Sequence, residues 1–237
     1  DFCLSRGLGD VYKRQNIDLP QEASSTYWEL EDVNDVELAT MSFGQRFTIT
    51  PIQLVSAISA IANDGVLMKP RIVKQIINPE TGTTTDIEPV QVRQVISKST
   101  SERMRDLMKS VVDDGSGRLA KVEGYSIGGK TGTSEPQAGR EDEGYIASYV
   151  AIAPTEKPEI CLLMAIHNPN PNGQGSHQGG QVCGPVISQM LTEILPILGI
   201  NSSNIQTPTS PVEENTSYVT VPDIRNKTVT EAEKILK

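Results

Sequence analysis

Three strand-like segments in the second half of the chain constrain its fold more than any other feature. They cover residues 125–133, 145–153 and 159–167, and each is bounded by Gly, Pro or polar turn residues. Only residues 154–158 separate the last two, which is short enough for an antiparallel hairpin and too short for a helical crossover. The sequence therefore predicts one antiparallel sheet built from all three segments.

Helices are predicted on both sides of these strands in the sequence. Thr50 is a suitable N-cap and Pro51 fits the first helical position, and the residues that follow are apolar on nearly every face up to Ala62. Residues 185–195 carry apolar side chains at helical spacing, which predicts a face that packs against the sheet. The predicted fold class is α+β, an antiparallel sheet flanked by helices.

A further helix is predicted to start near residue 99. Ser99 and Glu102 have the spacing of a capping box. The apolar positions that follow lie three or four residues apart and form one stripe: Met104, Leu107, Met108 and Val111. Further upstream, residues 71–77 and 83–87 are predicted to pair as strands across a turn.

Charge and composition exclude several classes of function. The chain has 21 basic and 30 acidic residues, a net charge of -9, and so offers no cationic surface for the phosphates of a nucleic acid. No stretch reaches the roughly 18 apolar residues that a membrane-spanning helix needs. The three cysteines show no C-x-x-C spacing, and His167 and His177 show no ligand spacing. We therefore expect neither a metal nor a cofactor.

The candidate binding site is Lys130-Thr131-Gly132-Thr133, which lies on the first predicted strand of the sheet. A lysine ammonium and two hydroxyls along one strand can hold a ligand carboxylate, and the glycine lets another backbone approach. The ligand can then pair with the strand, and a backbone N–H near Thr133 can face the oxyanion of an acyl transfer. Such a four-residue run also arises by chance in about one in a hundred chains of this length. The residues around it therefore determine whether the run is interpreted as a binding site.

Those neighbours resemble class B penicillin-binding proteins in order and spacing, over about residues 36–198. The similar runs are Ser42-Phe43-Gly44-Gln45, Thr50-Pro51-Ile52-Gln53-Leu54, Ala60-Ile61-Ala62-Asn63-Asp64-Gly65, and residues 124–133, which end in the K-T-G-T motif. The resemblance implies a peptidoglycan D,D-transpeptidase domain of the fold shared with serine β-lactamases, incomplete here at its N-terminal side. It implies Lys130 and Thr133 as catalytic residues, and Lys130, Thr131, Gly132 and Thr133 as substrate-binding residues.

The same resemblance implies what the protein acts on and where. The implied partners are peptidoglycan stem peptides that end in D-Ala-D-Ala, the β-lactams that mimic this terminus, and other cell-wall synthesis proteins. The implied location is the extracytoplasmic face of a bacterial cell membrane, with an anchor upstream of this sequence. The resemblance does not distinguish roles in division, elongation and sporulation.

Four segments are predicted along the chain. Residues 1–15 resemble a translated adaptor sequence and are interpreted as a non-native leader, the alternative being a native surface segment. Residues 16–200 form the C-terminal part of the transpeptidase domain. Residues 201–220 are rich in Ser, Thr, Asn, Pro and Glu and form a linker. Residues 221–237 resemble the start of a PASTA repeat and are too short to bury a core of their own.

The nucleophile of such an enzyme is missing from the sequence. No serine precedes a lysine by three positions, and the one S-x-N run, Ser202-Ser203-Asn204, lies in the polar linker. We therefore expect the reacting serine upstream, and expect this chain by itself to be inactive in acyl transfer. Two alternatives stay open: a serine β-lactamase-like hydrolase, against which the F-G-Q run and the PASTA-like end argue, and a non-catalytic sensor of β-lactams or peptidoglycan.

Overall fold

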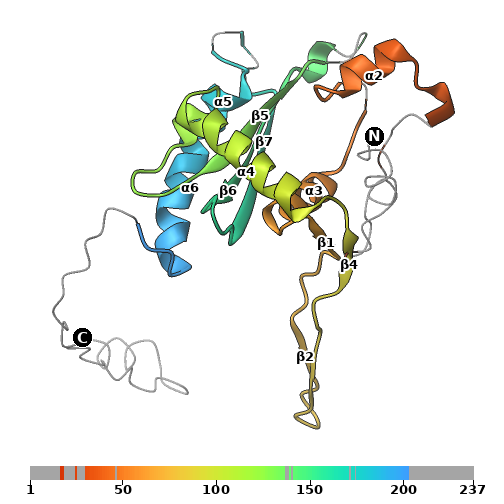
Figure 1. Ribbon diagram of the computed structural model, residues 1–237, viewed down its shortest axis with the longest axis vertical. Helices are drawn as coiled ribbons and strands as arrows, with labels where there is room; N and C mark the ends of the chain where they lie inside the picture. The colour runs from red at the N-terminus through yellow and green to blue at the C-terminus, as the bar shows by residue number, and fades with distance from the viewer. Residues whose placement is uncertain are drawn as a thin grey trace, which may run out of the picture. The chain divides into compact units, whose positions relative to one another are not determined.

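The computed structural model describes residues 17–18, 25, 30–45, 47–136, 139, 141–170, 172–173 and 175–202. The predicted leader at 1–15, the linker from residue 203 onward and the PASTA-like segment lie outside the described residues. The helices and strands (Figure 1) are, in chain order, η1 (Leu30–Asp32), α2 (Asp35–Met41), α3 (Pro51–Ala62), β1 (Val66–Met68), β2 (Gln75–Ile77), β3 (Thr84–Asp86), β4 (Gln91–Gln94), α4 (Lys98–Asp113), η2 (Arg118–Ala120), β5 (Gly128–Ser134), η3 (Glu141–Glu143), β6 (Ile146–Ala153), β7 (Ile160–His167), α5 (Gly179–Val182) and α6 (Gly184–Ile197).

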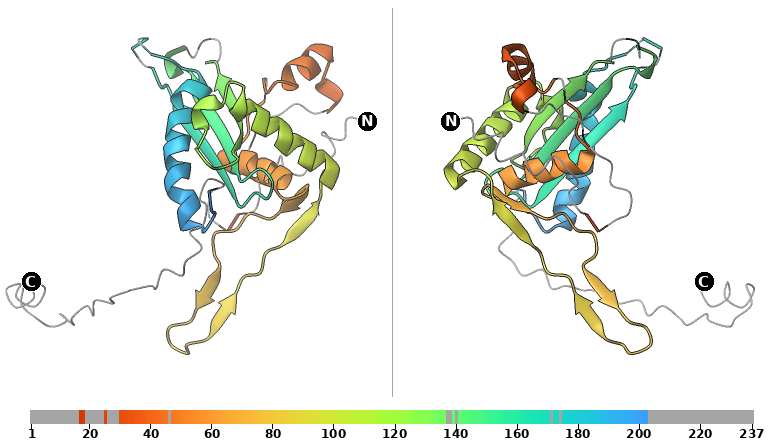
Figure 2. Two further views of the ribbon diagram at one scale, coloured as in Figure 1. Left: turned by 60° about the vertical axis from the view of Figure 1, so that its left-hand side comes forward. Right: turned by 90° about the vertical axis from the view of Figure 1, so that its right-hand side faces the viewer.

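The largest sheet among the described residues is three-stranded and antiparallel, in the order β5-β6-β7 (Figure 2). Thr131 pairs with Tyr149, and Tyr149 pairs with Met164, so the strand with the K-T-G-T motif lies at an edge. The prediction of one antiparallel sheet is confirmed. β5 begins three residues later than predicted, because the N–H of Tyr125 donates to the carbonyl of Val122 in a turn ahead of the strand.

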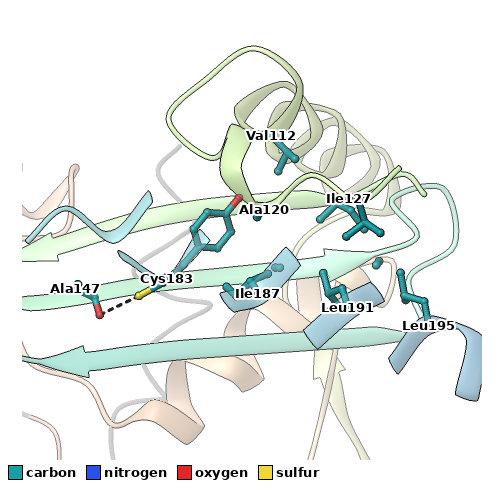
Figure 3. Close-up of a cluster of buried hydrophobic side chains, with 12 residues drawn as sticks. Val112, Ala120, Ile127, Ala147, Cys183, Ile187, Leu191 and Leu195 are labelled. Atoms are coloured by element: carbon teal, nitrogen blue, oxygen red, sulfur yellow. Dashed lines mark hydrogen bonds between the residues drawn. The ribbon is translucent and has the colours of Figure 1, made fainter. Parts of the chain in front are cut away.

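The main core lies between this sheet and α6 (Figure 3). Ile187, Leu191 and Leu195 repeat every four residues along α6 and have no exposed surface. Full burial of such a side chain contributes about 1.5–3 kcal/mol, so this stripe fixes α6 to the sheet. At its N-terminal end the thiol of Cys183 donates to the carbonyl oxygen of Ala147 on β6 at 3.5 Å.

Tyr149 sets the spacing between β5 and the loop that precedes η2. Its ring is fully buried and its hydroxyl donates to the carbonyl oxygen of Gly117 at 3.0 Å. Burial raises the pKa of Tyr149 to about 12, so the phenol keeps its proton at neutral pH. A Cβ atom on Gly129 would meet this ring at 2.5 Å, and therefore the residue that precedes Lys130 has to be small.

Asp64 joins the end of α3 to α4. Its carboxylate accepts a hydrogen bond from the guanidinium of Arg105 at 3.0 Å and lies 2.9 Å from the ammonium of Lys98. Arg105 is buried and also donates to the hydroxyl of Ser101 at 2.9 Å. Hydrogen bonds from Lys98 and then Arg105 lower the pKa of Asp64. Asp64 therefore supplies the negatively charged partner that the buried guanidinium of Arg105 requires.

The predicted capping box of α4 is wrong. Its N-cap is Ser97, whose hydroxyl accepts the N–H of Thr100 at 3.1 Å, so Ser99 is already helical. The predicted apolar stripe is also only partly buried, because Met104 and Leu107 are exposed at 37% and 57%. The buried positions of α4 are Ser101, Arg105, Met108 and Val112.

Polar contacts between α3 and α4 explain why α3 differs from its prediction. Instead of being buried on nearly every face, the helix buries only Gln53, Ser56 and Ala60. Thr50 is its N-cap with a full capping box to Gln53, as expected for a helix that starts at Pro51. The carbonyl oxygen of Ile61 accepts the hydroxyl of Ser101, so polar groups make much of the α3–α4 contact.

Four short strands form two further antiparallel pairs, β1 with β4 and β2 with β3. The predicted pairing of residues 71–77 with 83–87 is confirmed, but β2 covers only its last three residues. The N–H groups of Ile72 and Val73 donate to the carboxylate of Asp18 at 2.7 Å each, so this segment is held by a side chain rather than by a strand.

Within the described part of the chain, no helix combines the length and the apolar character needed to cross a bilayer.

Candidate functional site

β5 presents its two threonines on one face and Lys130 on the other, because successive side chains of a strand point to opposite faces. Thr131 and Thr133 both line a cleft of about 450 Å³, and Lys130 does not line it. The ammonium of Lys130 donates to the carbonyl oxygen of Thr131 at 2.6 Å, so it stays beside the backbone of the same strand. The structure thus brings the two predicted hydroxyls together and places the predicted cation apart from them.

Each threonine hydroxyl is held by a different segment of the chain. The hydroxyl oxygens of Thr131 and Ser116 lie 3.0 Å apart. The hydroxyl of Thr133 accepts the backbone N–H of Gly179 at 3.1 Å. A hydroxyl that accepts a hydrogen bond keeps its own hydrogen for a further acceptor, so Thr133 can donate to a ligand oxygen in the cleft.

Two glycines at the start of α5 allow this segment to lie directly against β5. A Cβ atom on Gly179 would collide with the carbonyl oxygens of Gly132 and Ser148, and one on Gly180 would collide with the carbonyl oxygen of Ser116. Sequence reasoning missed both glycines. The Gly-Gly pair ahead of a predicted helix was the pattern that could have indicated close packing of backbones there.

An aromatic pair forms part of the cleft lining. The rings of Tyr145 and His177 are stacked with centroids 3.9 Å apart and planes inclined by 17°. Both residues line the cleft. The sequence gave no reason to pair them, because they are far apart along the chain and His177 was weighed only as a metal ligand. The stack ties the loop before β6 to the loop before α5.

One further cleft residue comes from a run that resembled the transpeptidases, Gln45 of the S-F-G-Q run. Ser116, which comes from the loop before η2, also lines the cleft beside the threonines. Arg118 and Glu135 line it as well, and neither was singled out from the sequence. No group of three or more His, Cys, Asp or Glu side chains within the described residues could hold a metal ion.

Comparison with known proteins identifies the family. A family described as "Penicillin binding protein transpeptidase domain" matches residues 6–192. The chain belongs to this family. The transpeptidase match covers every element from η1 to β7, together with α5 and α6 up to residue 192. It also contains every residue that lines the cleft.

Relatives of this transpeptidase domain are longer proteins. The chain is 36% identical over 228 residues to stage V sporulation protein D of Bacillus subtilis, covering 94% of this chain and 35% of that protein. It is 31% identical over 225 residues to the probable peptidoglycan D,D-transpeptidase PenA of Neisseria flavescens, covering 94% and 50%. The chain therefore spans between a third and a half of the length of these two relatives.

Solved structures confirm the predicted α+β transpeptidase fold. Penicillin-binding protein 3 of Mycobacterium tuberculosis, complexed with ampicillin, is similar with a TM-score of 0.73 and 25% identity, over 86% of this chain and 47% of that one. The transpeptidase domain of penicillin-binding protein 3 from Burkholderia pseudomallei, without ligand, is similar with a TM-score of 0.69 and 31% identity, over 84% and 58%.

Proposed function

We propose that this chain is the substrate-binding part of a peptidoglycan D,D-transpeptidase. The observation that carries the proposal is the pair of hydroxyls of Thr131 and Thr133, which face one cleft from an edge strand. Hydroxyl donors spaced two residues apart suit a carboxylate, and the strand edge suits an extended peptide that adds to it. The ligand class is therefore a peptide ending in D-Ala-D-Ala, or a β-lactam that mimics this end.

The motif residues take different roles in this proposal. Thr131, Gly132 and Thr133 bind the substrate, and Gly132 leaves room for the substrate backbone. Thr133 also acts in catalysis, through a backbone N–H that faces the oxygen on which negative charge develops. Lys130 contributes positive charge from the opposite face of β5, where its long side chain can reach around the strand edge to the reacting groups.

The nucleophilic serine belongs to a part of the protein outside the 237 residues. The sequence contains no S-x-x-K, and its relatives are two to three times as long. Groups that act together in acyl transfer lose nearly all activity when the nucleophile is absent. The chain by itself is thus a binding module without transpeptidase activity.

Labelling with a fluorescent penicillin tests this proposal. The 237-residue chain should form no covalent adduct, and a protein that includes the residues preceding it in the gene should form one. A stable adduct of the short chain, detected by mass spectrometry of the intact protein, would show that a nucleophile is present here. Absence of an adduct in the longer protein would contradict penicillin binding and favour a different role for the cleft.

The wider context of the protein follows the same proposal. Residues 221–237 are the beginning of a PASTA repeat, joined to the domain through the linker at 201–220. The protein works on the extracytoplasmic face of a bacterial membrane, where its substrate lies, and acts with other cell-wall synthesis proteins. Protection of residues 221–237 from hydrogen exchange in the isolated chain would contradict a truncated repeat.

A further inference from the structure

The loop between β7 and α5 contains the only Asn-Gly dipeptide of the sequence, Asn172-Gly173. Both residues are exposed. Asparagine is one of the thermolabile residues, because a backbone nitrogen can attack its side-chain amide. A following glycine has no Cβ atom to hinder that attack and lets the backbone turn toward it. The proposed function makes no use of this pair, so the loop carries a chemistry of its own.

Two other asparagines of the same loop lack this chemistry. Asn168 and Asn170 are each followed by a proline, Pro169 and Pro171. Proline has no backbone N–H, so its nitrogen has no proton to lose and closes no neutral ring on the preceding side chain. The loop thus contains one reactive asparagine and two internal controls.

The two Asp-Gly pairs of the chain, Asp64-Gly65 and Asp114-Gly115, are packed too closely to form the same ring. A Cβ atom on Gly65 would collide with the carbonyl oxygen of Ile96. One on Gly115 would lie 2.8 Å from the carbonyl oxygen of Val111. The backbone at both glycines therefore has no room to turn toward the preceding carboxyl group.

Gly173 is not confined in this way. A Cβ atom at this position would meet no atom of the described residues within 4 Å. Its φ of 68° lies in the left-handed region, and glycine passes from there to other conformations at little cost. Its N–H donates to the carbonyl oxygen of Asn170 at 3.1 Å. Breaking one such hydrogen bond lowers the reactive population by only about two- to tenfold.

We propose that Asn172 converts spontaneously into aspartate and isoaspartate through a succinimide ring formed with Gly173. The nitrogen of Gly173 loses its proton and bonds to Cγ of Asn172. The bond from Cγ to Nδ2 breaks, and the amino group takes up a proton and leaves as ammonia. Water then adds to either carbonyl carbon of the ring and opens it, which gives the two acids.

The products change the charge and the length of a loop that leads into the cleft. Both carry a carboxylate where Asn172 is neutral, so the chain becomes more negative than its net charge of -9. Isoaspartate also adds a methylene to the main chain ahead of His177, which lines the cleft. The change does not reverse spontaneously, so it accumulates with the age of the molecule. This inference is independent of the proposed function.

Incubation of the folded 237-residue chain in neutral buffer, followed by digestion and mass spectrometry, tests the inference. The fragment that contains residues 168–178 should gain the mass difference between an amide and an acid, and its fragment ions should assign the change to Asn172. Water enriched in heavy oxygen should label the same residue. Protein isoaspartyl methyltransferase with labelled S-adenosylmethionine should methylate the incubated chain and not the fresh one.

The rate of conversion is a second readout. It should be about two- to tenfold lower than in a synthetic peptide with the sequence of residues 168–178, because the hydrogen bond of Gly173 has to open first. It should rise with pH, because the attacking nitrogen has to lose its proton.

Substitutions on either side of the reacting bond should stop or slow the conversion. Asn172→Gln keeps an amide but would need a larger ring, and it should abolish both acidic products. Gly173→Ala places a Cβ atom beside the attacking nitrogen and should slow the reaction well below the wild-type rate. Asn201→Gln is the matched control, because Asn201 is also exposed and lies outside the loop. It should leave the rate at Asn172 unchanged.

Two results would overturn the inference. If residue 172 stays asparagine in the folded chain while the synthetic peptide converts, the loop holds the nitrogen of Gly173 away from the side chain. If Asn168 or Asn170 converts as fast as Asn172, the ring with a following N–H is not the route, because a proline follows each of them. Conversion confined to Asn172 and lost in Asn172→Gln would establish the site.

Discussion

The backbone N–H of Gly179 donates a hydrogen bond to the hydroxyl of Thr133 at 3.1 Å. This contact joins the start of α5 to the motif strand, and it fixes the direction in which the hydroxyl can donate. The site therefore depends on a backbone group that comes from a segment far away in the sequence. Any change that moves α5 away from β5 should alter the cleft before it alters the sheet.

Gly179→Ala should destabilise the chain and disturb the cleft. The added Cβ would collide with the carbonyl oxygens of Gly132 and Ser148, which are backbone atoms and cannot rotate away. Overpacking of this kind costs about 1–3 kcal/mol. Urea unfolding followed by circular dichroism measures the change. Gly175→Ala, in the loop just before α5, is a matched control, because its Cβ would meet nothing closer than 3.7 Å. Equal stability of the two variants would contradict the close packing of α5 on β5.

Asp64→Asn should lower stability at neutral pH and have little effect in acid. Hydrogen bonds from Lys98 and Arg105 lower the pKa of Asp64 in the folded chain. A carboxyl with a lowered folded pKa contributes stability above its ordinary pKa, about 3.9, and loses that contribution as the pH falls through the folded value. Asparagine suits the left-handed backbone at this position, φ 51°, so the substitution removes charge without backbone strain.

The measurement for Asp64 is the urea midpoint of both proteins at neutral pH and at successively lower pH. The difference between them should be present at pH 7 and should shrink below about pH 4. Asp86→Asn on the exposed β2–β3 hairpin serves as the control for loss of one negative charge. A difference that does not depend on pH would show that Asp64 acts through something other than its charge.

Tyr149→Phe should destabilise the chain by about 0.5–1.5 kcal/mol, the net contribution of one hydrogen bond. The substitution removes the hydroxyl that donates to the carbonyl oxygen of Gly117 at 3.0 Å, whereas the N–H of Ala120 still donates to that oxygen at 2.9 Å. Tyr145→Phe is the control, because it keeps the stacking on His177 and its hydroxyl makes no hydrogen bond to a described residue. If Tyr149→Phe were as stable as the wild type, the hydroxyl would not contribute to holding the loop before η2.

The raised pKa of Tyr149 adds a test at high pH. A phenol whose folded pKa is about 12 stays neutral in the folded chain while it ionises in the unfolded chain at about pH 10. Stability of the wild type should therefore fall as the pH rises above about 10, and this part of the fall should be absent in Tyr149→Phe. Thermal unfolding at intervals between neutral and alkaline pH measures it.

Sequence patterns were sufficient for the sheet and for the main helices. Strand length, bounding Gly and Pro residues and the short 154–158 connection determine the β6–β7 hairpin. The capping box of Thr50 and Gln53 marks the start of α3. The patterns failed at α4, where the helix buries Ser101 and Arg105 instead of Met104 and Leu107. Hydrophobic periodicity does not predict a buried polar face whose partners come from another helix.

The cleft was predictable only in its motif strand. Thr131 and Thr133 were identified from the sequence because a lysine, two threonines and a glycine along one strand can bind a ligand carboxylate. Ser116, Gly179 and the Tyr145–His177 stack were not, because each acquires its role from a neighbour that only the folded chain supplies. The separation of Lys130 from the threonines follows from the alternation of side chains along a strand. Which other segments of the chain pack against each face of β5 could not be known from the sequence.

Lys130→Ala tests the predicted catalytic role of the motif lysine, in the longer protein that includes the upstream residues. The side chain is exposed, and its ammonium donates to the carbonyl oxygen of Thr131 and to no other residue that the structure describes. The change should therefore leave the unfolding free energy within about 0.5 kcal/mol. Acylation by a fluorescent penicillin should slow by about 10- to 100-fold, the effect of losing one contact from a charged donor. Stopped-flow fluorescence measures the rate.

The control for Lys130→Ala is Lys157→Ala in the turn between β6 and β7, where the side chain is 90% exposed. It removes the same charge away from β5 and should leave the acylation rate unchanged. Because Lys130 lies on the opposite face from Thr133, Thr133→Val should weaken ligand binding, whereas Lys130→Ala should mainly slow the covalent step. An unchanged acylation rate in Lys130→Ala would mean that the ammonium does not reach the reacting groups, and that the threonine face of β5 acts without it.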